Sequence, residues 1–261
     1  LRAALLGFVE GVTEFLPVSS TGHLLLVEAL LKHRQSDLFN VVIQSGAVLA
    51  VLAVFRERIT GLLLRWRERE SLDYLSRLAV AFLVTAAGGL ALKKLHLKLP
   101  VTAAPVAWAT LIGGVLFIGV ESWIRGRRQD AAIGWGVAVA VAVAQLVAAT
   151  FPGASRSGTT ILVALILGAS RPAATEFSFL LGVPTLLAAG AKETLDAMKE
   201  GEPHEPGIVL AVGCLVAAVT AFGVVRWLVG YVRSRDFVPF GWYRVIVGGL
   251  VLGMVWAGWL V

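Results

Sequence analysis

Charged residues are scarce in this sequence. Asp, Glu, Lys and Arg make up 15% of its 261 residues, and 57% are hydrophobic. A typical soluble domain carries about 25% charged residues, so this balance excludes an ordinary soluble enzyme and predicts a polytopic membrane protein. The alternating ten-residue pattern of a membrane β-barrel is also missing. We therefore predict an all-α helical bundle.

Cysteine is almost absent as well. Cys214 stands alone, which excludes an intrachain disulfide, and its apolar surroundings predict a small packing or lipid-facing residue. The chain begins with Leu1 rather than Met, so the start of the first helix is left open. Residues 7–10 run straight into a polar motif without a small-residue cleavage site, and we expect no cleavable signal peptide.

The net charge of +6 would suit a nucleic-acid partner, but the basic residues lie in loops between apolar runs. The positive-inside bias of membrane proteins explains them, so we expect no nucleic acid partner. The predicted cytoplasmic side carries Arg56, Arg58, Arg65, Arg67, Arg69, Arg125, Arg127, Arg128, Arg171, Arg233 and Arg235. The opposite side carries Lys32, Arg34, Lys93, Lys94, Lys98, Lys192 and Lys199, diluted by Asp196, Glu200, Glu202 and Glu205.

Hydrophobic runs divide the chain into long spans and shorter arms. We predict spans at about 39–55, 74–92, 101–123, 176–191, 207–226 and 241–261. Shorter arms, at 1–16 and 18–31 and at 132–150 and 157–169, are broken by Pro17 and Pro152. An arm of 14 residues rises only about 21 Å, too little to cross a hydrocarbon core of about 30 Å. Each pair of arms therefore predicts a re-entrant hairpin, whose tip is buried in protein or lines a wet cavity.

The two halves of the chain share one order of elements, a hairpin followed by three spans. Matching pairs are Pro17 with Pro152 and Ser20 with Ser155 at an offset of 135, and Asn40 with Glu176 and Gly46 with Gly182 at 136. Three spans change the side of the membrane, so the second half should be inverted. We predict one integral membrane domain, 1–261, with a first repeat at 1–123 and a second, inverted-topology repeat at 132–261. The hairpin tips should then meet inside the protein.

The first polar motif, residues 10–23, reads EGVTEFLPVSSTGH. An ionisable group at bilayer depth costs roughly 2.5–3.5 kcal/mol, so it persists where it is paired, hydrated or used. Glu10 and Glu14 lie one helical turn apart. This spacing suits a divalent cation with oxygen ligands, or a carboxylate that pairs with an arginine or a histidine.

Three hydroxyl residues, Ser19, Ser20 and Thr21, follow in the same motif and precede an apolar helix. The free amides at a helix start, together with the helix dipole, form an anion site. Capping alone accounts for one hydroxyl and does not require three. His23 lies one turn beyond Ser20 and can act as its base, as a general acid or as a phosphate donor.

The second polar motif, residues 151–160, reads FPGASRSGTT. Gly153 and Gly158 let the backbone approach a ligand closely, and Arg156 can clamp phosphate oxygens with its guanidinium fork. Hydroxyl donors surround them, namely Ser155, Ser157, Thr159 and Thr160. A helix N-cap alone would explain the Gly/Ser turn, but an arginine between two apolar helices favours a phosphate site.

With these motifs the chain closely resembles the bacterial undecaprenyl pyrophosphate phosphatases, the family whose overproduction gives bacitracin resistance. The matching segments are 10–23, 39–44, 152–158, 170–171, 176–181, 237–240 and 243–244. The resemblance runs essentially from end to end, and the segments 10–23 and 152–158 are long and specific.

The resemblance implies an integral enzyme that removes the terminal phosphate from undecaprenyl diphosphate. Its products would be undecaprenyl phosphate and inorganic phosphate, which recycles the lipid carrier for peptidoglycan synthesis. A divalent cation, Mg²⁺ or Ca²⁺, is implied, and Glu10 and Glu14 are the expected ligands. We expect a multi-pass protein of the bacterial cytoplasmic (inner) membrane with its site open to the outer, periplasmic face. Whether it forms a homodimer is left open.

The functional residues of that family map onto Glu10, Glu14, Ser20, His23 and Arg156. We expect Ser20 to be the nucleophile and His23 to assist proton transfer. Glu14 with Glu10 would hold the metal or orient the base, and Arg156 would stabilise charge on the transferred phosphoryl group. Residues expected to bind the phosphates are Ser19, Thr21, Gly153, Ser155, Ser157 and Thr160. Attack by metal-activated water and a covalent His23 intermediate stay open.

A transporter or flippase of a polyprenyl phosphate lipid is the alternative function. Inverted repeats with hairpins near the midplane suit alternating access, and an anion site can carry its ligand instead of cleaving it. A carrier needs donors for the phosphates, but it has no evident need for adjacent carboxylates, a hydroxyl and a histidine. The local chemistry therefore favours hydrolysis.

Overall fold

The computed structural model describes residues 1–32, 34–95, 102–200 and 205–260. Its helices, in chain order, are α1 (Arg2–Thr13), α2 (Ser20–Leu31), α3 (Asp37–Val54), α4 (Arg56–Leu64), α5 (Arg69–Lys94), α6 (Ala103–Ile124), α7 (Trp135–Thr150), α8 (Arg156–Ile166), α9 (Arg171–Glu200), α10 (Gly207–Tyr231) and α11 (Val238–Trp256). Six of them, α3, α5, α6, α9, α10 and α11, are long and apolar enough to cross a membrane. The prediction of an all-α polytopic membrane protein is confirmed.

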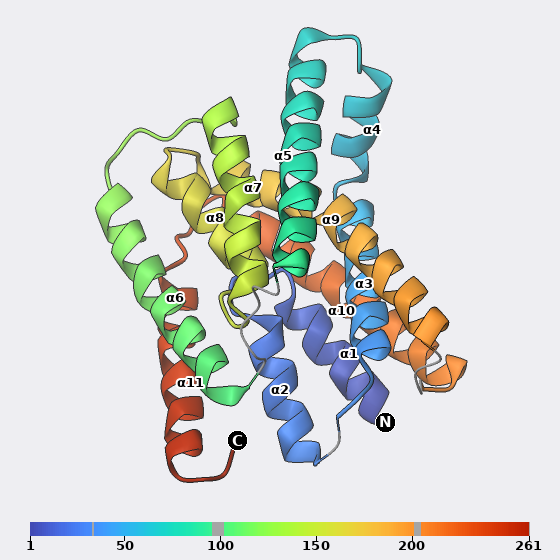
Figure 1. Cartoon of the computed structure of the whole chain (residues 1–261). Helices are drawn as coiled ribbons and strands as arrows, with labels where there is room; N and C mark the ends of the chain where they lie inside the picture. Colours follow the sequence, from blue (N-terminus) through green and yellow to red (C-terminus); the bar gives the residue numbers. More distant parts are fainter. Residues whose placement is uncertain (33, 96–101, 201–204, 261) are drawn as a thin grey trace.

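Two helical hairpins interrupt the series of long helices, at the positions that the prolines indicate. Helices α1 and α2 have 12 residues each, and α7 and α8 have 16 and 11. At 1.5 Å per residue these arms are about 17–24 Å long, shorter than a hydrocarbon core of about 30 Å. Figure 1 shows α1 and α2 in the lower half of the molecule and α7 and α8 in the upper half, with their tips meeting near the centre.

Several helix boundaries differ from the predicted spans, those of α9 and α11 among them. Helix α9 runs from Arg171 to Glu200 and contains Pro184, whereas the hydropathy pattern predicts 176–191. Its start was missed because arginine and proline look like a loop, although proline is well tolerated in the first turn of a helix. Helix α11 ends at Trp256, because Gly258 adopts a left-handed φ of +74° and reverses the chain.

Small residues let helices pack backbone to backbone. A Cβ atom on Gly11 of α1 would lie 2.6 Å from the carbonyl oxygen of Ala217 in α10. A Cβ atom on Gly114 of α6 would lie 2.6 Å from the carbonyl oxygen of Gly241 in α11. Such contacts are typical of helix pairs in membranes, where close packing replaces the hydrophobic effect as the source of association. The first hairpin arm is thereby held tightly against a membrane span.

The hairpins pack reciprocally on the two halves of the chain. Helix α1 of the first half packs on α10 of the second, and α7 of the second half packs on α5 of the first. The division into repeats at 1–123 and 132–261 stays a prediction, and so does the inverted relation between them.

A buried ion pair joins three helices on the arginine-rich side. Glu121 near the end of α6 is 2% exposed and accepts hydrogen bonds from the Nε and Nη2 atoms of Arg171 at the start of α9. Its Oε1 atom also accepts the backbone N–H of Phe237, just before α11, at 2.9 Å. Because the buried carboxylate has three donors, its charge is compensated where no water reaches it.

Candidate active site

The second helix of each hairpin begins with the same kind of N-cap. Ser19 precedes α2 with φ +76°, and its Oγ atom accepts the backbone N–H of Gly22 at 3.3 Å. Ser155 precedes α8 with φ +70°, and its Oγ atom accepts the N–H of Gly158 at 3.1 Å. A positive φ costs a non-glycine residue on the order of 1–3 kcal/mol, so the surrounding contacts must hold both serines in place. Such imposed conformations cluster at functional sites.

The two caps change which residues of the two motifs correspond to each other. The sequence match places Ser20 on Ser155, but Ser155 has the conformation and the bond of Ser19. The second tip has one residue more between its proline and its capping serine, which changes the offset from 135 to 136. Ser20 and Arg156 therefore both stand at the first position of their helices.

Glu14 joins these two residues. The Oγ atom of Ser20 donates a hydrogen bond to Glu14 Oε2 at 2.7 Å, and Arg156 Nη2 donates to Glu14 Oε1 at 3.2 Å. The Glu14 residue is only 6% exposed, and each of its carboxylate oxygens thus has one donor, from opposite hairpins. The structure brings together three residues that the sequence assigned to the site, and the predicted meeting of the tips is confirmed.

Arg156 keeps donors for a ligand. Its Nη1 atom donates to the carbonyl oxygen of Ser178 at 3.4 Å, and its guanidinium lies 5.6 Å from the centre of the Phe15 ring. Its Nε atom is buried and has no hydrogen-bond partner among the described residues. A guanidinium fixed by these contacts, with N–H groups still unpaired, suits a planar contact with phosphate oxygens.

Substituting Gly182 with alanine should displace Arg156 without touching any other predicted site residue. A Cβ atom at this position of α9 would collide with the guanidinium of Arg156. Because misplacing a catalytic group by about 1 Å can cost a factor of about 100, we expect a loss of roughly that size in kcat. Phosphate release by purified protein measures it. The matched control is Gly249→Ala, where a Cβ atom would meet nothing within 4 Å; equal activities in the two variants would contradict the prediction.

Two buried hydroxyls of the second tip are bonded within the protein, and one of them joins the two hairpins. The Oγ atom of Ser157 contacts the carbonyl oxygens of Leu16 at 3.0 Å and Glu14 at 3.3 Å, across the junction of the tips. Thr160 donates to the carbonyl oxygens of Arg156 and Ser157 in its own helix, at 2.8 and 3.0 Å. Both residues are fully buried. The structure thus gives them bonds within the protein, and phosphate binding by them stays a prediction.

The remaining predicted phosphate ligands differ in accessibility. Ser19 is 1% exposed and its Oγ atom serves as the cap of α2, whereas Thr21 is exposed and lines a polar cavity. Gly153 is buried at φ +94°, and a Cβ atom there would collide with the backbone of Val106 in α6. Only glycine therefore allows this close approach of the second tip to α6.

Arg244 is a site residue whose role the sequence did not reveal. It is fully buried in α11, and the acceptors of its hydrogen bonds among the described residues are carbonyl oxygens. Its acceptors are Pro17 in the first tip, Gly153 and Ala154 in the second tip, and Ala109 and Thr110 in α6, at 3.0–3.2 Å. A single guanidinium thus binds both tips to the same span. The available signal was a lone arginine inside the apolar run 241–261.

His23 faces away from the Ser20–Glu14 pair. Its Nδ1 atom lies 2.7 Å from the carbonyl oxygen of Ser19, and its Nε2 atom lies 2.7 Å from Tyr243 Oη. The two rings are stacked, with centroids 5.6 Å apart. A carbonyl oxygen only accepts, so the proton of a neutral ring is assigned to Nδ1, and Nε2 accepts from the tyrosine. The expected contact of His23 with Ser20 is replaced by the contact of Glu14 with Ser20.

Glu10 is buried with both carboxylate oxygens free. It is 1% exposed, and within the described ranges neither oxygen has a hydrogen-bond partner. It lines a cavity of about 210 Å³ whose other polar walls include Ser20, Thr21, Asn40 and Gln44. The Oδ1 atom of Asn40 is also buried, and no described residue donates to it. Unpaired acceptor oxygens in a buried cavity fit a hard cation, which prefers oxygen ligands.

Known proteins resemble this chain over nearly its whole length. Residues 3–250 match the family described as bacitracin resistance protein BacA. An undecaprenyl-diphosphatase of Rhizobium etli (strain CIAT 652) is 50% identical over 261 residues, covering 99% of this chain and 98% of that protein. An undecaprenyl-diphosphatase of Xylella fastidiosa (strain 9a5c) is 46% identical over 252 residues, covering 96% of each chain.

Proposed function

This chain belongs to the bacitracin resistance protein BacA family, and we propose that it is an integral membrane phosphatase that hydrolyses undecaprenyl diphosphate. The products are undecaprenyl phosphate and inorganic phosphate. This reaction returns the lipid carrier to peptidoglycan synthesis and fits a role in bacitracin resistance. The observation that carries the proposal at the level of residues is the contact of Glu14 with both Ser20 and Arg156.

The geometry supports Ser20 as the nucleophile and Glu14 as its base. In the first step the Ser20 hydroxyl proton passes to Glu14 Oε2 along the 2.7 Å hydrogen bond. The Ser20 oxygen attacks the terminal phosphorus, and the bond from that phosphorus to the bridging oxygen breaks, which releases undecaprenyl phosphate. In the second step water attacks the phosphoserine, Ser20 recovers a proton and inorganic phosphate leaves. Arg156 binds the equatorial oxygens of the transferred group through its unpartnered Nε atom.

His23 and Tyr243 have a different part in this proposal. Their hydrogen bond places a proton-exchanging pair beside the first tip, with the imidazole oriented by the Ser19 carbonyl. We assign to the pair the exchange of a proton with the departing lipid phosphate. In this assignment His23 keeps a catalytic role, and Glu14 is the base that activates Ser20, a role first considered for His23.

A divalent cation fits the cavity beside Ser20. Glu10 and Glu14 would hold it. Their carboxylates lie one helical turn apart, and the unpaired oxygens of Glu10 would be stabilised by a bound cation. Asn40 Oδ1 could add a neutral oxygen ligand from α3. No group of three or more His, Cys, Asp or Glu side chains is placed to hold a metal within the described part of the chain, so such neutral oxygens matter. When bound, Mg²⁺ or Ca²⁺ would neutralise phosphate charge.

The site should open to the outer face of the cytoplasmic membrane. The cavity at Glu10 also borders Arg34 and Asp37, at the loop between α2 and α3, on the side opposite to the arginine-rich loops. Arginine-rich loops are typical of the cytoplasmic side. Substrate whose diphosphate lies at the outer leaflet would then reach the tips directly.

Thiol labelling can test this orientation. Cys214 is the single native cysteine, so Cys214→Ser gives a cysteine-free background. In that background Thr21→Cys, at an exposed position lining the cavity, should react with a membrane-impermeant maleimide added to intact spheroplasts. Arg65→Cys, exposed beyond α4, should react only after permeabilisation. The reverse pattern would place the site on the cytoplasmic face.

The reaction itself is tested by phosphate release from undecaprenyl diphosphate by purified protein in detergent, with Mg²⁺, Ca²⁺ or EDTA. We expect release that stops in EDTA and returns when either cation is added in excess. Protein that binds the lipid but releases no phosphate under any of these conditions would overturn the proposal. The relatives are named as hydrolases, and the alternative of a transporter is accordingly not favoured.

A further inference from the structure

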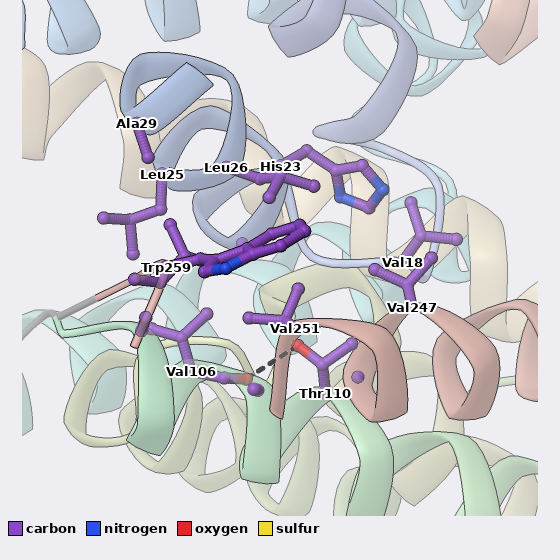
Figure 2. A pocket seen from close by; sticks show the side chains of 15 residues that line it. Val18, His23, Leu25, Leu26, Ala29, Val106, Thr110, Val247, Val251 and Trp259 are labelled. Carbon is purple, nitrogen blue, oxygen red and sulfur yellow. Dashed lines mark hydrogen bonds between the residues drawn. The ribbon is translucent and has the colours of Figure 1, made fainter. Parts of the chain in front are cut away.

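An apolar groove of about 170 Å³ begins at the first hairpin tip and runs between α2, α6 and α11. Its inner end is formed by Val18, Gly22 and His23, beside the capping serine. Its walls are almost entirely aliphatic, with Leu25, Leu26, Ala29, Val106, Val247 and Val251 among them. Figure 2 shows His23 at one end of this groove. The groove therefore starts beside His23, at the beginning of α2.

The α6 wall of the groove packs against the second tip. Thr110, the polar residue of its α6 wall, donates to the carbonyl oxygen of Val106 at 2.8 Å and contacts that of Gly153 at 3.3 Å. The hydroxyl of this residue is therefore used within the protein, so the wall offers a ligand chiefly apolar surface. A ligand held here would touch the first hairpin at its inner end and mostly aliphatic side chains further out.

Helix α2 separates this groove from the polar cavity. Gly22, His23, Leu26 and Ala29 face the groove, whereas Ser20, Thr21, Leu24 and Glu28 face the cavity that contains Glu10. The two sets follow the period of a helix, so they lie on opposite sides of α2, and Leu25 borders both spaces. One side of the helix suits a hydrocarbon chain and the other suits water, a cation and phosphate.

Trp259 covers the groove from outside. The N–H groups of Gly258 and Trp259 bond to the carbonyl oxygens of Val255 and Met254 at 3.0 and 2.9 Å, which is the Schellman pattern of a helix end. The left-handed φ of Gly258 then directs the indole back over α11. Figure 2 shows it lying across the groove, and it remains 77% exposed. Trp259 is thus an outer flap and not a core residue.

We propose that this groove binds the isoprene units nearest to the diphosphate and that Trp259 closes over them. The inference rests on the proposed function and names how its substrate is held. A polyprenyl chain needs apolar walls and no hydrogen bonds, and the groove leads to His23, to which we assign proton exchange with the lipid phosphate. An aromatic flap packs against a methyl-branched chain at little cost in entropy, because indole has few rotamers.

Short isoprenoid substrates test the groove by hydrolysis. With geranyl diphosphate, Ala29→Phe should fill the groove and raise KM about tenfold or more, while kcat changes less than about twofold. Trp259→Ala should raise KM roughly fivefold, because each substrate methylene that becomes exposed to water weakens binding about fourfold. The matched control is Leu30→Phe, which adds a ring at the next position of α2 but at a residue outside the groove and 67% exposed. An unchanged KM in the first two variants overturns the proposal.

A binding measurement separates this inference from the proposed function. In the Cys214→Ser background, Ala29→Cys should be protected from maleimide at least about tenfold by geranyl diphosphate and not by inorganic diphosphate. Protection without hydrolysis would support the groove and contradict the phosphatase. Hydrolysis without protection would support the phosphatase and contradict the groove. If neither protection nor hydrolysis were seen, both proposals would be overturned. Equal protection by phosphatidylglycerol micelles would identify the occupant as bilayer lipid and also overturn the inference.

Discussion

Replacing Ser20 with alanine is expected to lower phosphate release by a factor of about 1,000 or more, the size of effect seen when a nucleophile is removed. The Ser20 hydroxyl is the one that donates to Glu14, at 2.7 Å, beside the guanidinium of Arg156. Thermal unfolding should change little, because the Ser20 side chain makes neither of the two cap bonds at the hairpin tips. Single-turnover phosphate release from undecaprenyl diphosphate in detergent measures the loss.

Glu14→Gln is the partner experiment, because it keeps the shape of the side chain and removes its basicity. We expect a loss of about 100-fold to 10,000-fold, the range that general-base catalysis supplies. Ser76→Ala is the control, since the Ser76 hydroxyl donates to the carbonyl of Asp73 within α5. If Ser20→Ala kept a tenth of the activity while Glu14→Gln lost it, water and not Ser20 would be the attacking group. The stereochemical course at the terminal phosphorus would then decide, because one direct attack by water inverts its configuration and two displacements through a phosphoserine retain it.

Removing Arg244 is expected to have the largest effect on the fold of the site. Arg244→Met leaves five carbonyl acceptors without their guanidinium donor, in both tips and in α6. A hydrogen bond to a charged group contributes about 1.5–3 kcal/mol, so losing several of them should cost on the order of 5 kcal/mol in unfolding free energy. We expect a fall in Tm by about ten degrees or more in detergent, together with loss of phosphatase activity.

Lysine at position 244 keeps the charge but cannot reproduce the planar fork, so Arg244→Lys should recover only part of the stability. The matched control is Arg226→Lys in α10, where the arginine is exposed. A wild-type Tm in Arg244→Met would show that other contacts hold the tips. Activity lost at unchanged Tm would instead make Arg244 a residue that positions the tips without stabilising the bundle.

Hydropathy and proline together predicted most of the architecture. Runs of about 20 apolar residues must form helices in a bilayer, because no other element there satisfies its own backbone hydrogen bonds. Pro17 and Pro152 marked the hairpin tips correctly, since proline lacks the backbone N–H of a helical hydrogen bond and tends to break or kink a helix. The ends of α9 and α11 were less accurate, because Pro172 in a first turn and Gly258 in a C-cap act through local backbone geometry that hydropathy does not register.

Composition and motif spacing were sufficient to identify a membrane protein with two polar hairpin tips and to name Glu10, Glu14, Ser20, His23 and Arg156 as its candidate site residues. The partner of each residue was decided only by the tertiary structure. Glu14 and Arg156 are 142 residues apart, and His23 and Tyr243 are 220 apart. A hydrogen bond requires two atoms to approach within about 3 Å, so it depends on the rotation and depth of each helix. Those are set by close packing across the whole bundle, and local sequence patterns do not contain them.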